Sequence, residues 1–202
     1  MPAASLAICA AFFFFAAPPF WESKPPQQWS GEEINILLHD SPWAQIASAP
    51  PKNADAAPVQ VYIASAPPMR AAELELARRR ALRRRIPESD ADLEYAAYLR
   101  ENEGKQIIVA VSMPNARALS DGEESRRMQE ECIMKIGRKK YKITGNFPPS
   151  ADDPYLRLIF PRTLQPSDKS VEFDLYIPGL PEPYRMVSFR VKDMLYKGAP
   201  AF

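Results

Sequence analysis

The hydrophobic positions along the chain change their spacing near Gly104. In several stretches before it, they recur every three or four residues, which is the spacing of an amphipathic helix. After it, they run continuously or alternate with polar residues, which is the spacing of β-strands. Helices followed by hairpin-connected strands predict an α+β fold with an antiparallel sheet of about five to six strands.

The clearest helix start lies at residues 30–33. Ser30 can accept a hydrogen bond from the backbone of Glu33, whose side chain can return one to the backbone of Ser30, and together these form a capping box. We therefore expect a short helix that ends near Asp40. Its apolar face is made by Ile34, Leu37 and Leu38.

A second short helix is expected directly after the first. Ser41 can cap it, and Pro42 suits its first position. Trp43 and Ile46 would then point inward. The two helices would form a pair at the start of the domain.

The remaining elements follow from composition and alternation. A strand is expected over 59–63, and helices over 69–86 and from the cap Ser89 to Gly104. The β-branched run 107–111 suits a buried central strand, whereas 156–160, 171–176 and 186–191 alternate as strands with one wet face do. A hairpin is expected at 132–143 around Gly137-Arg138, and a polar loop or short helix at 115–127.

Residues 6–17 (LAICAAFFFFAA) are apolar and carry no charge. The run is too short to span a bilayer as a helix, which takes about 20 residues, but it matches the hydrophobic part of a secretory signal. No Lys or Arg precedes it, and no A-x-A site follows it. We expect export, over the alternative of a cytosolic protein that packs this segment into its core. The chain then divides into a signal peptide or N-terminal anchor (1–17), a proline-rich tether (18–29) and a single α+β domain (30–202).

Two segments resemble a group of uncharacterised secreted bacterial proteins. The first carries Phe20-Trp21-Glu22, Lys24-Pro25, Trp29-Ser30, Glu33-Ile34, Leu37-Leu38 and Asp40-Ser41-Pro42-Trp43-Ala44; the second carries Phe189 to Met194 and Tyr196-Lys197-Gly198. The resemblance implies an extracytoplasmic protein, periplasmic or secreted, with no assigned activity. It would be N-terminally anchored if the leader is retained.

The composition of the chain argues against several kinds of binding site. The net charge of +1 gives no overall attraction to nucleic acid or to anionic membranes. His39 is the only histidine, so the chain lacks a Cys/His set with metal-ligand spacing, and no glycine-rich phosphate loop occurs. Neither a metal nor a cofactor is expected. Cys9 lies in the leader, and Cys132, in an alternating apolar run, is interpreted as a buried structural thiol.

The strongest charge pattern is the run from Arg78 to Arg85. Seven arginines and two glutamates give residues 70–85 a net +5, and six acids with one arginine give residues 88–103 a net −5. We expect the two helices to neutralise each other through weak surface pairs. The alternative is an anionic partner surface, with nucleic acid disfavoured for an exported protein. The candidate partner-binding residues are Arg78, Arg79, Arg80, Arg83, Arg84 and Trp21.

The tryptophans Trp21, Trp29 and Trp43 gather near the N-terminus. Exposed indoles could stack on a sugar or a partner, whereas buried ones would fasten the N-terminal segment to the sheet. Burial is expected for Trp29 and Trp43, whereas for Trp21 neither burial nor exposure is predicted.

No catalytic residue is assigned. His39-Asp40-Ser41 contains the residue types of a serine hydrolase triad, but adjacent residues cannot align in that way, and no nucleophile elbow is present. Asp40 and Ser41 are better explained as helix caps. A catalytic carboxylate pair would need the fold to place two acids on opposite sides of a cleft. Asp152-Asp153-Pro154 is interpreted as a turn that precedes a strand.

The sequence thus favours a non-enzymatic binding or scaffolding module of the cell envelope, with an unknown envelope protein or polymer as partner. Membrane association through an uncleaved leader is compatible with this. The alternatives are a hydrolase of envelope polymers that uses carboxylates assembled by the fold, and a binder of anionic surfaces through the arginine-rich helix. An enclosed pocket with convergent carboxylates around His39 would favour the hydrolase, and a shallow surface with exposed aromatics the binder.

Overall fold

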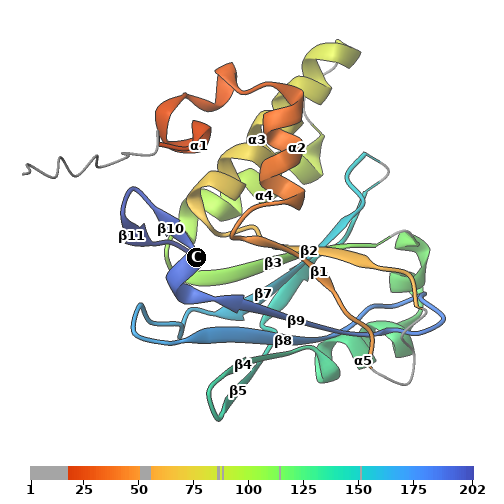
Figure 1. Cartoon of the computed structure of the whole chain (residues 1–202). Coiled ribbons are helices and arrows are strands. Elements are labelled where there is room, and N and C mark those ends of the chain that lie inside the picture. The colour runs from red at the N-terminus through yellow and green to blue at the C-terminus, as the bar shows by residue number, and fades with distance from the viewer. Residues whose placement is uncertain (1–17, 51–55, 86, 88, 114, 151) are drawn as a thin grey trace, which may run out of the picture.

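Two antiparallel sheets form the framework of the protein. The computed structural model describes residues 18–50, 56–85, 87, 89–113, 115–150 and 152–202, so the predicted leader lies outside the described residues. Helices α2, α3 and α4 gather on one side of the sheets, while α5 lies apart from them beside the second sheet (Figure 1). The α+β fold expected from the spacing of hydrophobic residues is confirmed.

The first sheet has five strands in the order β1-β2-β3-β7-β6. Its central strand is β3, which pairs with β2 on one side and along its whole length with β7 on the other. The β-branched run therefore occupies the middle of the sheet, as predicted. The strands are β1 (Ala44–Ala47), β2 (Val59–Ile63), β3 (Gln106–Ser112), β6 (Gly145–Phe147) and β7 (Tyr155–Pro161).

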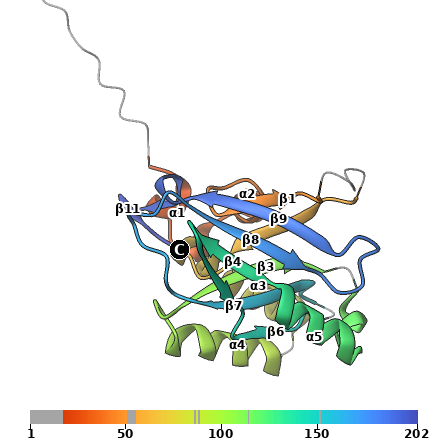
Figure 2. The same cartoon turned by 90° about the horizontal axis from the view of Figure 1, so that it is seen from below.

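The second sheet has four strands in the order β5-β4-β8-β9, and it meets the first sheet at one edge. There the backbones of Ser48 and Met186 exchange two hydrogen bonds of 2.9 and 2.8 Å. This bridge places β9 beside β1, as the view from below also shows (Figure 2). The strands are β4 (Ile133–Ile136), β5 (Lys139–Lys142), β8 (Ser170–Tyr176) and β9 (Tyr184–Arg190), followed by the separate hairpin β10 (Leu195–Tyr196) and β11 (Ala199–Pro200).

Helices α2 and α4 begin where the local signals place them. In α2 both hydrogen bonds of the predicted capping box are present, and Ser89 caps α4 by accepting from the backbone of Asp92. None of the helices in the described residues has the length and apolar character needed to cross a bilayer. They are α1 (Phe20–Ser23), α2 (Gly31–His39), α3 (Pro67–Arg84), α4 (Asp90–Glu101) and α5 (Gly122–Glu131), with 3₁₀ turns η1 (Pro26–Gln28), η3 (Ala116–Ser120) and η4 (Val191–Asp193).

Ser30→Ala is expected to lower the free energy of unfolding by about 1 kcal/mol, because the backbone N–H of Glu33 loses the side-chain acceptor 3.0 Å away. Urea unfolding followed by circular dichroism measures the change. Ser30→Asp, which keeps an acceptor at the cap, is the matched control and should stay close to the parent. Equal losses in both variants would contradict the capping role.

The second predicted helix, from Ser41 to Ile46, is wrong. Residues 41–43 form a turn, and β1 follows, pairing with β2 from Ala44↔Tyr62 to Ala47↔Val59. Trp43 is fully buried as expected, but Ile46 is 55% exposed. The cap-like residues Ser41 and Pro42 are local signals, and strand pairing with residues 12 to 18 positions further along the chain overrides them.

One further local prediction needs correction. The β7 strand is buried along both faces instead of having one wet face, because the helices cover the sheet on the side away from the second sheet (Figure 1). Of the three strands expected to have one wet face, β8 and β9 show the alternation. Residues 115–127, expected to be a polar loop or a short helix, contain η3 and the first part of α5, with Asp121 capping α5, so the helical alternative is confirmed.

The N-terminal segment and the C-terminal hairpin lie against each other. The carboxylate of Glu22 accepts from the backbone N–H of Lys197 at 2.7 Å, and the indole N–H of Trp43 donates to the carbonyl of Ala201 at 2.6 Å. Phe20 and Trp21 in α1 are partly buried against the core. The two segments that carry the resemblance are therefore neighbours in the fold.

Cys132 is a fully buried free thiol, as interpreted from its apolar run. Its sulfur accepts from the backbone N–H of Tyr176 at 3.3 Å. Burial raises the pKa of Cys132 to about 12. The folded protein thus keeps a proton that an unfolded thiol releases above about pH 8.5.

The raised pKa predicts a loss of stability at alkaline pH. Between about pH 8.5 and 12 the unfolded chain binds fewer protons than the folded one, so Cys132 lowers the free energy of unfolding by up to about 1.4 kcal/mol per pH unit. Urea unfolding at several pH values measures the slope, and Cys132→Ala should flatten it by this amount. Identical pH slopes in the two proteins would contradict the prediction.

Candidate functional site

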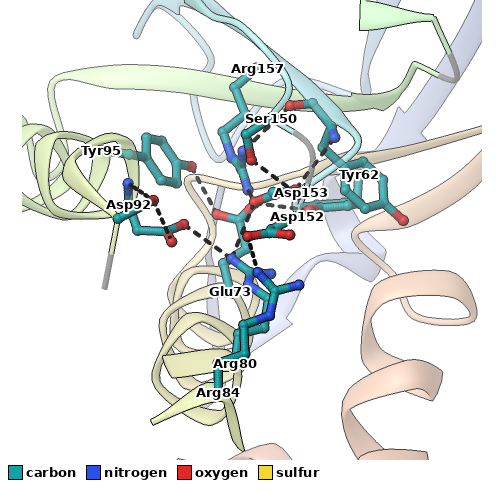
Figure 3. A network of polar contacts seen from close by, with 12 residues as sticks. Tyr62, Glu73, Arg80, Arg84, Asp92, Tyr95, Ser150, Asp152, Asp153 and Arg157 are labelled. Carbon is teal, nitrogen blue, oxygen red and sulfur yellow. Dashed lines mark hydrogen bonds and ion pairs between the residues drawn. The ribbon is translucent and has the colours of Figure 1, made fainter. Parts of the chain in front are cut away.

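A buried polar network links α3, α4 and the first sheet. Its centre is Glu73, which accepts from the hydroxyls of Tyr62 and Tyr95, each at 2.8 Å. Arg157 on β7 donates to the same carboxylate from Nε at 3.0 Å, and its Nη2 lies 2.8 Å from the same oxygen as an ion pair. Figure 3 shows Glu73 between the two tyrosines, with Arg157 reaching it from the sheet. All four residues are buried.

Arg157 is held on several sides. Its Nη2 donates to Asp153 at 2.7 Å, and its guanidinium lies 4.3 Å from the ring centre of Tyr95. Burial alone would lower the pKa of Arg157, but the Glu73 carboxylate raises it well above its ordinary value. Burial, followed by the charge of Glu73, raises the pKa of Tyr62 and Tyr95. Arginine and tyrosines therefore keep their protons, and remain donors to Glu73, at any physiological pH.

Two arginines of α3 extend the network toward solvent. Nη2 of Arg80 lies 3.1 Å from Asp92 and 3.7 Å from Asp153, and Arg84 pairs with Asp152 (Figure 3). The turn before β7 thus supplies two of the anions that meet the arginine-rich helix. Nε of Arg80 is buried and has no hydrogen-bond partner among the described residues.

A pocket of about 300 Å³ lies beside this network. Helix α2 supplies one side through residues spaced three and four apart, and α3 supplies another through Glu73, Leu76 and Arg80. Tyr62 and the start of β7 complete the wall. The α2–α3 pocket, as we call it, is lined by Gly31, Ile34, Asn35, Leu38, His39, Tyr62, Glu73, Leu76, Arg80, Asp153, Pro154, Tyr155 and Arg157.

The fold brings His39 to the same pocket as Glu73 and Asp153, which the sequence did not reveal. His39 is exposed, and its Nδ1 lies 2.9 Å from the carbonyl of Asn35. One signal pointed to the network: Glu73 falls on the apolar face of its helix beside Met69 and Ala72. A charged residue in that position needs a buried partner. Nothing in the sequence, however, indicated which residue it would be.

Most of the candidate arginines are bonded within the chain. Arg78 and Arg79 both pair with the buried Glu75, at 2.7 and 2.6 Å, and Arg79 also donates to the carbonyl of Trp29 at 2.5 Å. Arg80 and Arg84 belong to the network above. Arg83 is exposed and makes no hydrogen bond or ion pair with another described residue.

The expected neutralisation between neighbouring helices occurs only in part. Arg80 with Asp92 joins α3 to α4, and Arg70 pairs with Glu103 just beyond α4. The other pairs run to Glu75 in the same helix and to the turn before β7. The acidic helix is therefore one of three partners of the arginine run.

Arg79→Ala is expected to lower the free energy of unfolding by about 1–2 kcal/mol, because it removes the bonds to Glu75 and to the Trp29 carbonyl. Arg83→Ala, four residues further along the same helix, should stay within about 0.5 kcal/mol of the parent. Urea unfolding of the two variants checks the difference. Equal effects would show that these bonds contribute no more than the exposed residue.

Trp21 is not an exposed stacking surface. It is partly buried, its ring packs edge-on against Phe20 at 4.9 Å and Trp43 at 6.0 Å, and its Nε1 is buried without a partner among the described residues. Trp21 also lines a second cavity of about 310 Å³ together with Lys24 and Lys197. Trp29 and Trp43 are buried, as expected.

Among the described residues, no three His, Cys, Asp or Glu side chains are placed to hold a metal ion.

Comparisons with known proteins do not identify the chain. No protein-family model matches the chain, and neither the curated proteins nor the solved structures contain a match to it.

Proposed function

We propose that the protein is an extracytoplasmic module of the cell envelope that binds a ligand or partner without catalysing a reaction. The observation that carries this proposal is that both carboxylates lining the α2–α3 pocket are bonded to donors of the same chain. Glu73 accepts from two tyrosines and Arg157, and Asp153 accepts from Arg157. Both acids therefore serve to hold the wall of the pocket.

A hydrolase is the alternative that the pocket itself raises, because His39, Glu73 and Asp153 all line it. A two-carboxylate hydrolase needs one carboxylic acid to protonate the leaving group and a second carboxylate to act as base or nucleophile. Here one guanidinium, that of Arg157, binds both carboxylates at 2.7–2.8 Å. Neither acid has the freedom that those two roles require, so binding is favoured over hydrolysis.

Binding of an anionic surface through the arginine-rich helix has less support. Of the five candidate arginines, four are engaged with acids of the same chain. An external anion would have to replace these partners. Arg83 alone is a weak basis for such a surface.

Location in the envelope rests on the sequence. The apolar run at 6–17 and the resemblance of both ends to secreted proteins support export. The two ends lie together in the fold, joined by Glu22 and Lys197. A common structural role in holding the N-terminal segment would explain why both ends carry the shared motif.

Fractionation of a Gram-negative host that expresses the full chain tests the location. An antibody should be used for detection, because Phe202 is buried and its carbonyl accepts from Arg162, so a C-terminal tag would disturb the fold. We expect the protein in the periplasmic or membrane fraction, and N-terminal sequencing will show whether the leader is cleaved. Recovery of the intact chain in the cytosol would contradict export.

Incubation of the purified protein with peptidoglycan and envelope polysaccharides tests the absence of catalysis. We expect no release of reducing sugars or peptides above a heat-denatured sample. Asp153→Asn is the informative variant, because it alters a pocket carboxylate at the edge of the network. Product release that disappears in this variant would refute the non-enzymatic proposal and favour the hydrolase.

A further inference from the structure

We infer that the α2–α3 pocket binds a small uncharged molecule with an apolar body and one hydrogen-bonding edge. This inference rests on the proposed binding function and names the class of ligand for it. The pocket's volume of about 300 Å³ lies at the lower end of the range for small-molecule sites, about 300–1,000 Å³. Three features of the lining define the ligand: an apolar wall, unused polar groups and paired charges.

The apolar wall comes from both helices. Ile34 and Leu38 lie one turn apart on the inner face of α2 and are 1% and 4% exposed, and Leu76 faces them from α3. The ring of Tyr62 and Pro154 add further apolar surface. Displacing water from such a surface favours a ligand with a hydrophobic body, by roughly 25 cal/mol per Å² buried.

Polar groups with unused capacity surround this wall. The ion pairs of Arg80 involve Nη2 alone, which leaves Nη1 without a hydrogen bond to the described residues. The hydroxyl of Tyr155 likewise makes none with the described part of the chain. Asn35 and His39 are exposed and line the pocket from α2. These groups include both donors and acceptors, so they suit an amide, carbonyl or hydroxyl edge.

The charges of the lining are already paired. Arg80 and Arg157 face Glu73 and Asp153, so the two cations and two carboxylates cancel. Arg80 is further shared with Asp92. An ion entering the pocket would lose its hydration without finding a free counter-charge, which is costly. The pocket therefore discriminates against charged molecules, whether anionic or cationic.

Four probes that share one ring and differ in the head group test this inference. They are benzamide and benzyl alcohol, which are neutral, benzoate, which is anionic, and benzylamine, which is cationic. The full-length protein, labelled at Ile and Leu methyl groups, is titrated with each probe and followed by NMR. We expect the neutral probes to shift the methyl signals of Ile34, Leu38 and Leu76 with millimolar affinity, and the charged probes to bind at least about tenfold more weakly.

Two substitutions on α3 provide a matched pair. Leu76→Phe fills the pocket and should weaken benzamide binding at least about fivefold, whereas Leu82→Phe, at a position 62% exposed and outside the pocket, should not change it. Tyr155→Phe removes a hydroxyl from the pocket and should weaken benzamide by about two- to fivefold. Tyr155→Phe keeps the test valid if Leu76→Phe fails to fold.

Three outcomes would overturn the inference. These are no shift of the pocket methyls below about 10 mM for any probe, charged probes that bind as well as neutral ones, or equal effects of Leu76→Phe and Leu82→Phe. None of these outcomes bears on the compartment or on polymer turnover, which the earlier experiments measure separately. Failure of the ligand class and failure of the proposed function can therefore be told apart.

Discussion

Arg157→Met is expected to lower the free energy of unfolding by about 3–5 kcal/mol, because it removes the cation that pairs with the buried Glu73. Glu73 would remain 7% exposed with no cation beside it, and Asp153 would lose its bond of 2.7 Å. Leaving a buried carboxylate without its partner costs more than the ion pair contributed. Denaturant unfolding followed by circular dichroism measures the loss.

The double variant Arg157→Met with Glu73→Gln separates these two costs. The glutamine carbonyl can still accept from Tyr62 or Tyr95, but no charge is left without a partner. We therefore expect the double variant to be more stable than Arg157→Met alone by about 1–2 kcal/mol. Arg126→Met, which breaks an exposed pair with Glu130, should stay within about 0.5 kcal/mol of the parent. An equally small loss for Arg157→Met would mean that the network is not structural.

Trp43→Ala is expected to lower the free energy of unfolding by about 3–5 kcal/mol, because it leaves a large cavity at a fully buried site. The indole N–H also donates to the Ala201 carbonyl at 2.6 Å, which holds the C-terminal residues against the core. Thermal and denaturant unfolding followed by circular dichroism avoid reliance on the fluorescence of the residue that is replaced.

Trp43→Phe is the matched control for the hydrogen bond. It keeps much of the apolar volume but leaves the Ala201 carbonyl without its donor, so an intermediate loss of about 1–3 kcal/mol is expected. If Trp43→Phe were as destabilising as Trp43→Ala, packing would contribute little. If both were near zero, the contact between the C-terminal hairpin and the core would not contribute to stability.

The network also determines how rigid the wall of the α2–α3 pocket is. Glu73, Arg157 and Asp153 form one wall of the α2–α3 pocket, and the buried rings of Tyr62 and Tyr95 fix the carboxylate at its centre. A wall built from paired charges is stiff, because moving any member leaves another unpaired. The pocket is thus preformed, which lowers the cost of ordering it around a ligand.

Local patterns determined a large share of the fold. The signals for four elements lie within the elements themselves. They are the capping box at Ser30, the cap at Ser89, the helix-favouring composition over most of 69–86 and the β-branched run at 107–111. Hydrophobic alternation also placed β8 and β9. These elements could be predicted because the interactions that specify them are short in sequence.

What the sequence determined by itself was the fold class, the capped helices, the central strand and the buried thiol. The tertiary structure decided the rest: the turn and strand at 41–47 form because β2 offers a partner, and the site exists because Glu73 meets residues 11, 22 and 84 positions away. A charged residue on the apolar face of a helix indicates that it will need a partner. Its burial and its pairing, however, arise only when distant segments pack together. The pocket and its paired charges were therefore visible only in the folded molecule.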